Sequence, residues 1–146
     1  MKTGHLAEVF GCFEGKIVCG DDFPGKMKGK PEPDIFLVAA REQLGRKVGE
    51  GTECSEDEKE VRGKGLVFED AIPGMQAGKR AGMSGKRSLK STSVTINRFC
   101  LIIAVVWIPD INLLDVEYSG PEKADQTLKS IEEFAPEQWG LPPYDP

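Results

Sequence analysis

Short apolar runs alternate with helical patterns along this chain, and this alternation limits its fold more than any other feature. Runs rich in β-branched or aromatic residues read KIVCG, LVFED and VVWIPD, and they occupy Lys16–Gly20, Leu66–Asp70 and Val105–Asp110. Apolar residues at helical spacing occur in other segments, namely His5–Phe13, Pro33–Gly45, Ala71–Met83 and Lys123–Phe134. Strands that alternate with helices predict an α/β fold with a largely parallel sheet.

Turn-forming residues set the expected ends of two helices. Asp34 is expected to cap its helix at the N-terminus, and Gly45 is expected to end it. Pro73 suits the first turn of the later helix, which Gly82 is expected to end.

Two further stretches show neither of these patterns. Residues 46–65 are polar and rich in charge and glycine, which predicts a flexible surface insertion. The tail is rich in proline, and we expect it to pack Trp139 and Leu141 onto the body of the protein.

The chain has 146 residues, a formal net charge of −5 and a pI of about 5.0, which suits one domain with its own core. A mildly acidic protein has no overall attraction for nucleic acid or anionic lipid, so neither is expected as a partner. The longest apolar run, Leu101–Ile108, is shorter than the ~20 residues that a membrane-spanning helix needs. The start has no signal-peptide core, and the four cysteines are widely spaced, so we expect a cytoplasmic protein with reduced thiols.

Carboxylates close two of the predicted strands. Glu69 and Asp70 end the second run, and Asp21 and Asp22 follow the first. Ligands of parallel sheets bind at the carboxyl ends of the strands, and adjacent carboxylates there offer the oxygen donors that Mg²⁺ prefers. The alternative for Glu69 and Asp70 is a helix N-cap. For Asp21 and Asp22 we favour a turn or capping role over catalysis.

The stretch GKPEPDIF, Gly29–Phe36, places Lys30 directly before a rigid Pro-x-Pro turn and the start of a helix. A lysine fixed in this way is suited to pair with a phosphate and a carboxylate together. The alternative is an ordinary loop lysine, which is how we interpret Lys26 and Lys28.

Together these stretches resemble the haloacid dehalogenase (HAD) superfamily. GKPEPDIF is similar to the family's third motif and LVFEDAIPGMQAGKRAGM to its fourth, and the nearest subgroup is that of pseudouridine-5′-phosphatase-like and sugar-phosphate phosphatases. The resemblance implies the C-terminal part of a Rossmann-like core over residues 1–146. It also implies a Mg²⁺-dependent phosphatase of small phosphorylated metabolites, such as sugar or nucleoside phosphates, that works through a phosphoaspartyl intermediate. Lys30 would then be catalytic, and Asp70 and Glu69 would bind the metal ion.

The sequence departs from the family at the nucleophile. The family's first motif is Asp-x-Asp-Gly on a central strand, and no two aspartates of this chain stand two positions apart. The second motif and the cap domain are also missing, so the expected core is incomplete and its sheet lacks the central strand. We expect an N-terminally truncated, inactive chain; the alternative is a pseudoenzyme that keeps half of a phosphate site. Substrate identity and oligomeric state stay open.

A second departure is the stretch 84–104, basic and rich in serine and threonine before it turns apolar. About twenty residues stand where α/β connections typically take 2–6. We interpret it as a translated intron or a lineage-specific insertion. Its basic residues, Lys86, Arg87, Lys90 and Arg98, offer a phosphate-binding patch as the alternative.

Overall fold

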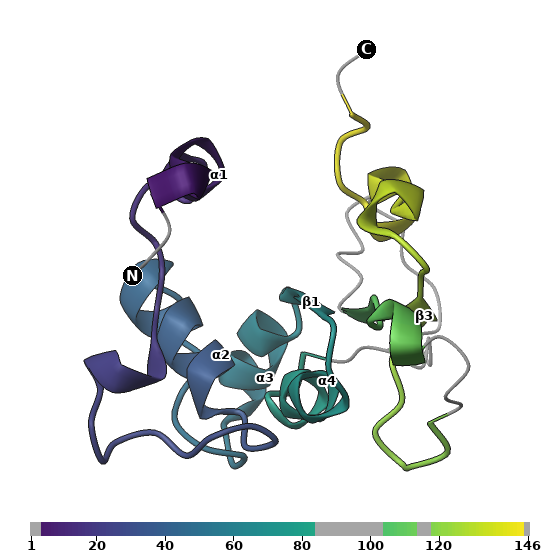
Figure 1. Cartoon of the computed structure of the whole chain (residues 1–146). Helices are drawn as coiled ribbons and strands as arrows, with labels where there is room; N and C mark the ends of the chain where they lie inside the picture. Colours follow the sequence, from purple (N-terminus) through teal and green to yellow (C-terminus); the bar gives the residue numbers. More distant parts are fainter. Residues whose placement is uncertain (1–3, 84–103, 114–117, 145–146) are drawn as a thin grey trace.

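The computed structural model describes residues 4–83, 104–113 and 118–144, and it has the predicted α/β architecture (Figure 1). A three-stranded parallel sheet has the order β1-β2-β3. Its strands are β1 (Leu66–Glu69), β2 (Ala104–Trp107) and β3 (Gln126–Thr127). The α-helices of these residues are α1 (Ala7–Gly11), α2 (Asp34–Val38), α3 (Glu56–Arg62) and α4 (Ile72–Arg80).

The second and third apolar runs form the strands that the sequence predicts. Val67 pairs with Val105 and Phe68 with Val106 in parallel register. All of β2 is buried, as expected for a parallel strand covered on both faces. Its apolar, β-branched sequence is therefore explained by its place in the middle of the sheet.

The predicted strand at Lys16–Gly20 is wrong. Its residues join no sheet, because the strand pairs of the described residues are β1 with β2 and β2 with β3 alone. The amides of Lys16 and Ile17 instead donate to turn carbonyls at Phe13 and Gly15. A β-branched run becomes a strand only where a neighbouring strand accepts its backbone hydrogen bonds.

The helix predicted at Pro33–Gly45 is present as α2, followed by one wide π-type turn at Ala39–Gln43. Gly45 ends it with a φ of +61°, as predicted. The prediction that Asp34 caps the helix is wrong, because Pro33 is the N-cap. The Asp34 carboxylate instead accepts the backbone N–H of Lys28 at 2.8 Å and so ties the preceding loop to the helix.

The stretch 46–65, predicted to be a flexible surface insertion, contains helix α3. Ser55 and Glu58 form a capping box: the hydroxyl of Ser55 accepts the Glu58 N–H at 3.3 Å, and the Glu58 carboxylate accepts the Ser55 N–H at 2.7 Å. At the other end of α3, the Arg62 side chain is buried. Its guanidinium donates to the carbonyls of Val48 and Gly51 at 2.5 and 2.9 Å, which fixes the loop before the helix.

Helix α4 confirms the prediction for Ala71–Met83. Pro73 lies in its first turn, and Gly82 leaves the helix with a φ of +75°. Gly78 lets α4 lie close on the sheet, because a Cβ atom at this position would stand 2.9 Å from a methyl group of Val105.

The helix predicted at Lys123–Phe134 is wrong. This segment forms β3 and a single 3₁₀ turn at Ile131–Glu133. Asp125 exchanges backbone and side-chain hydrogen bonds with Val105, and the Leu128 amide donates to the Trp107 carbonyl at 2.9 Å. Pairing with the buried strand β2 therefore outweighs the helical spacing of the apolar residues.

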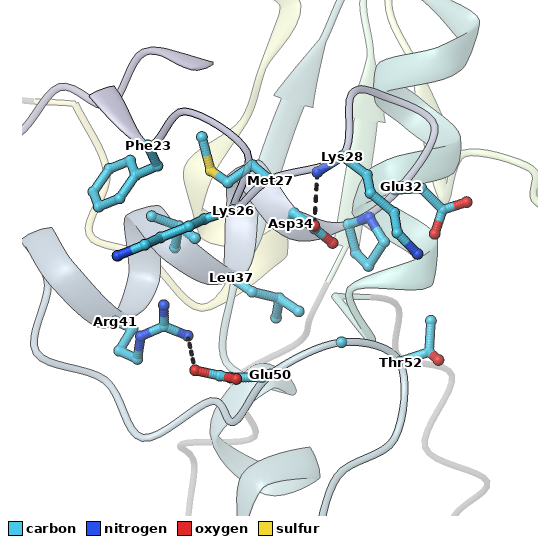
Figure 2. A pocket seen from close by; sticks show the side chains of 13 residues that line it. Phe23, Lys26, Met27, Lys28, Glu32, Asp34, Leu37, Arg41, Glu50 and Thr52 are labelled. Atoms are coloured by element: carbon cyan, nitrogen blue, oxygen red, sulfur yellow. Dashed lines mark hydrogen bonds and ion pairs between the residues drawn. The ribbon is translucent and has the colours of Figure 1, made fainter. Parts of the chain in front are cut away.

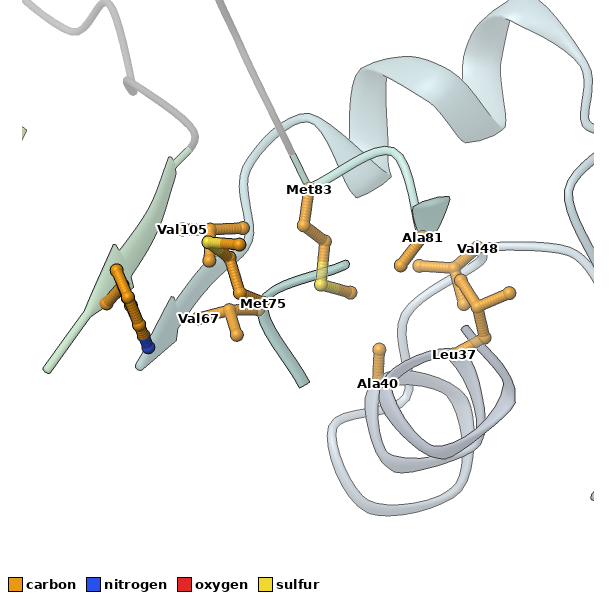
Figure 3. Close-up of a cluster of buried hydrophobic side chains, with 9 residues drawn as sticks. Leu37, Ala40, Val48, Val67, Met75, Ala81, Met83 and Val105 are labelled. Carbon is orange, nitrogen blue, oxygen red and sulfur yellow. The ribbon is translucent and has the colours of Figure 1, made fainter. Parts of the chain in front are cut away.

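The core lies on both faces of the sheet. One cluster joins α2, the loop at Val48, α4 and the sheet, and Figure 3 shows Leu37, Ala40 and Val48 on one side of it, with Met75 against Val67 and Val105 on the other. Its remaining buried members are Ala81, Met83 and Trp107.

A smaller cluster covers the opposite face with Val106, Leu128 and Phe134. Trp139 packs against Phe134, with ring centroids 6.5 Å apart, as predicted for the tail. Leu141, by contrast, is 39% exposed, so its predicted packing is wrong.

Helix α1 stands apart from this core in Figure 1 and buries none of its residues. The stretch 84–103, with its four basic residues, lies outside the described residues, and Ala104 begins β2. Within the ranges that are described, no helix has both the length and the apolar character needed to cross a membrane.

Candidate functional site

Lys30 and Glu69 meet in the structure although they are 39 positions apart in the sequence. Lys30 lies in the turn before α2, and Glu69 is the last residue of β1. The ammonium of Lys30 forms an ion pair and hydrogen bond with Oε1 of Glu69. The Glu69 side chain is 7% exposed and that of Lys30 is 39% exposed, so the cation keeps an open side toward solvent. The two motifs therefore converge on one place.

The turn around Lys30 is rigid for local reasons. The Glu32 amide donates to the Gly29 carbonyl at 3.1 Å, and Pro33 is buried at the start of α2. The Lys30 ammonium also lies 5.5 Å from the ring centroid of Phe36, a cation–π distance. A carboxylate and an aromatic face thus hold this lysine in one orientation.

The Glu69 carboxylate is positioned by a glycine that the sequence analysis missed. Gly74 lies in α4 beside it, and a Cβ atom at this position would stand only 1.9 Å from Oε2 of Glu69. No side chain fits at this position while the carboxylate stays where it is. The available signal was a glycine in the first turn of a predicted helix, where glycine is intrinsically unfavourable.

Asp70 lies beside Glu69 with a different environment. Asp70 is exposed, and its backbone carbonyl accepts the indole N–H of Trp107 at 2.9 Å. The N-cap residue of α4 is Ala71, and no side-chain capping hydrogen bond is formed at this end of the helix. Neither carboxylate therefore caps α4. The alternative of an N-cap pair is therefore wrong. Within the described ranges, no cluster of three or more histidine, cysteine, aspartate or glutamate side chains is arranged to hold a metal ion.

Asp21 and Asp22 take the turn role that we favoured. They lie in a 3₁₀ turn at Gly20–Asp22, and the Asp22 carboxylate accepts the backbone N–H of Cys19 at 2.7 Å. They follow the segment Lys16–Gly20, which joins no sheet, and no described contact brings them to Lys30 or Glu69.

A second feature that the sequence analysis missed is a charged tie through Arg80, at the end of α4. Its guanidinium binds Glu122 at 2.6 and 3.3 Å and Glu32 at 3.2 Å. The hydrogen bond to Glu122 is the main cause that raises the pKa of Arg80 above its ordinary value. Glu32 belongs to the turn of Lys30, so this tie links that turn to the segment before β3.

No family model matches the chain. The chain is 36% identical to (DL)-glycerol-3-phosphatase 2 of Arabidopsis thaliana over 145 residues, which is 99% of this chain and 45% of that protein. It is 35% identical to a probable pseudouridine-5′-phosphatase of Drosophila melanogaster over 144 residues, 99% of this chain and 46% of that protein.

A third relative is the bifunctional riboflavin kinase/FMN phosphatase of Arabidopsis thaliana, 32% identical over 133 residues, 91% of this chain and 24% of that protein. The chain thus spans less than half the length of these relatives. Its similarity to the first two covers nearly all of its residues, including the turn of Lys30 and the strand end at Glu69 and Asp70. On these grounds the chain belongs to the haloacid dehalogenase superfamily of hydrolases.

Proposed function

We propose that the Lys30–Glu69 site is the phosphate-binding part of a phosphatase that acts on small phosphorylated metabolites. The observation that carries this proposal is the ion pair between the two motifs, which leaves one side of the Lys30 ammonium open to solvent. The names of all three relatives describe removal of phosphate from a small molecule, and this supports the same substrate class here.

In this proposal Lys30 binds a non-bridging oxygen of the phosphate monoester. An ammonium has three donors, so one can stay on Glu69 while another reaches the ligand. Glu69 fixes the direction of the Lys30 side chain, and Phe36 limits its movement on the other side. Because the cation is positioned before the ligand arrives, it stabilises developing negative charge with little reorganisation.

The donors beside this lysine suit Mg²⁺. That ion is commonly held by one or two carboxylates together with water and substrate phosphate, and Asp70 and Glu69 supply two adjacent carboxylates. Asp70 is the stronger candidate ligand because it is exposed, whereas Glu69 is already bound to Lys30. When bound, Mg²⁺ would supply positive charge that offsets the charge of the phosphate.

The covalent step has no assigned residue in this chain. A phosphoaspartyl mechanism in this family uses the order Asp-x-Asp, which the sequence does not contain. This specific absence favours a second candidate function, phosphate-monoester binding without hydrolysis. We therefore propose that the chain by itself binds the ligand with Mg²⁺ and does not turn it over.

Purified full chain tests both candidates with glycerol 3-phosphate and pseudouridine 5′-phosphate in Mg²⁺. We expect saturable binding by calorimetry that Lys30→Ala abolishes, that Asp70→Asn weakens and that Lys47→Ala, at an exposed position away from the site, leaves unchanged. Phosphate release at ordinary phosphatase rates would exclude the non-catalytic function. Binding that ignores Lys30 and Asp70 would contradict both candidates.

A further inference from the structure

A cavity of about 510 Å³ lies on another side of the Lys30 turn (Figure 2). Three segments line it: the loop from Phe23 to Lys28, the turn and first part of α2, and the loop at Glu50–Thr52. This volume lies within the range of about 300–1,000 Å³ that is typical of small-molecule sites. Lys30 and Glu69 do not line the cavity, so it is distinct from the candidate phosphatase site.

The acidic side chains around the cavity have partners, whereas two of its lysine side chains form no ion pair within the described part of the chain. Its three acids already have partners: Asp34 accepts the amide of Lys28, Glu32 binds Arg80, and Glu50 lies 3.7 Å from Arg41. The ammonium groups of Lys26 and Lys28, in contrast, form no ion pair with any residue that the structure describes. Figure 2 shows the two lysine side chains extending toward opposite ends of the cavity. The groups left to be satisfied are therefore cationic.

The rest of the lining is apolar. Pro33, Leu37 and Val38 are buried residues that form the wall on the side of α2, and Phe23 and Met27 come from the loop opposite. A ligand that fits such a lining carries an apolar ring or chain as well as its negative charge. An inorganic ion alone would leave this apolar surface in contact with water.

The loop at Glu50–Thr52, which forms the third wall of the cavity, is held in place by Arg62. Arg62 is 1% exposed, and its guanidinium donates to the carbonyls of Val48 and Gly51, the second of which lines the cavity. Hydrogen bonds from a charged group are stronger than those between neutral groups, so these two bonds hold the loop against the end of α3. The cavity is thus preorganised on the side of Glu50–Thr52.

From these observations we propose that the cavity binds a small organic anion, whose phosphate or carboxylate group contacts Lys26 or Lys28 at one end and whose apolar part lies along the wall formed by Leu37 and its neighbours. Residues on both sides of Lys30, namely Lys28 and Glu32, line this cavity. Binding there would hold the Lys30 turn without using the phosphatase site. The proposal stands whether or not the chain hydrolyses phosphate monoesters.

The test uses phenyl phosphate and benzoate as probes, titrated into the full chain and followed by ¹H–¹⁵N spectra and calorimetry. We expect both probes to shift the amides of Phe23–Lys28 and Glu50–Thr52, and we expect inorganic phosphate and the neutral benzyl alcohol to bind more weakly. Whichever of the two probes binds more tightly identifies phosphate or carboxylate as the preferred group.

Matched variants decide the location. One of the two changes Lys26→Ala and Lys28→Ala, the one that removes the contacting ammonium, should weaken binding of the probes about three- to tenfold, whereas Lys47→Ala should not. Lys30→Ala separates the two sites, because it should abolish metabolite binding at the phosphatase site and leave probe binding in the cavity intact. The proposal is overturned if neither probe binds, if benzyl alcohol binds as tightly, or if Lys30→Ala abolishes the shifts that benzoate, which is not a phosphate monoester, causes at Phe23–Lys28 and Glu50–Thr52.

Discussion

Asp125 binds Lys79 through both of its carboxylate oxygens, at 2.8 and 2.9 Å, and one of them also accepts the backbone N–H of Val105. Both side chains are mostly buried, at 17% and 16% exposed. One carboxylate therefore joins α4, β2 and the start of β3.

Replacing this carboxylate should destabilise the protein strongly. Asp125→Ala leaves the buried Val105 amide and the Lys79 ammonium without their partner, and we expect a loss of about 2–3 kcal/mol in the free energy of unfolding. Urea unfolding followed by circular dichroism measures it. The control is Glu56→Ala, which removes an exposed partner of Lys59 and should leave the midpoint unchanged. Equal effects of the two changes would contradict the assigned role of Asp125.

Gly74 should tolerate no side chain while Glu69 keeps its place. Gly74→Ala puts a methyl group where the carboxylate lies, so we expect a loss of about 1–3 kcal/mol and a displaced Glu69. Gly11→Ala is the matched control, because a Cβ atom there meets nothing within 4 Å. Thermal unfolding measures stability, and carboxyl ¹³C shifts report the position of Glu69.

The double variant Gly74→Ala with Glu69→Asp tests the cause. A shorter acid vacates the space that the new methyl group needs, so stability should partly return. If the double variant is as unstable as the sum of both single changes, the clash with Glu69 is not the reason for the glycine.

The start of α3 should respond to acid. Hydrogen bonds from the backbone and the side chain of Ser55 lower the pKa of Glu58 below its ordinary value. A depressed folded-state pKa contributes stability above the unfolded value, and this contribution is lost as the pH falls through the folded pKa. Titration of the Glu58 carboxyl by NMR should therefore show the low pKa, and Ser55→Ala should raise it. An unchanged pKa in Ser55→Ala would show that the Ser55 hydroxyl does not bond to the Glu58 carboxylate in solution.

Arg62 should be hard to replace. Arg62→Met removes both donors to the loop at Val48 and Gly51, and we expect unfolding to become easier by about 2–4 kcal/mol. Arg62→Lys should recover only part of this loss, because an ammonium lacks the planar fork of donors. Arg46→Met, at an exposed position, is the control for loss of a charge. Recovery of full stability by lysine would mean that charge alone, and not the fork, is required.

Much of the fold follows from patterns that a single sequence carries. The apolar runs at β1 and β2 and the proline and glycine that bound α4 rest on local signals, whereas a common site for Lys30 and Glu69 was implied by the family resemblance of their motifs. The capping box of Ser55 and Glu58 was also readable, as a serine followed three positions later by glutamate, but the surrounding charge and glycine hid it.

The wrong predictions concern segments whose structure depends on tertiary contacts. The segment around Asp125 has helical spacing, yet the unpaired edge of β2 offers its backbone better partners than a helix would. Lys16–Gly20 has a strand composition, yet no described strand lies beside it. The roles of Gly74 and Arg62 depend on neighbours that are distant in the sequence, namely Glu69 for the glycine and the loop at Val48 and Gly51 for the arginine. The local sequence carries little information about such contacts.

The tie through Arg80 has a mechanical consequence. An arginine guanidinium keeps its proton at every pH that the folded chain would meet, so Arg80 is a permanent cationic anchor. Arg80 thereby connects Glu122, before β3, with Glu32 in the turn before α2. A displacement of the segment before β3 would thus be transmitted to the proline turn that carries Lys30.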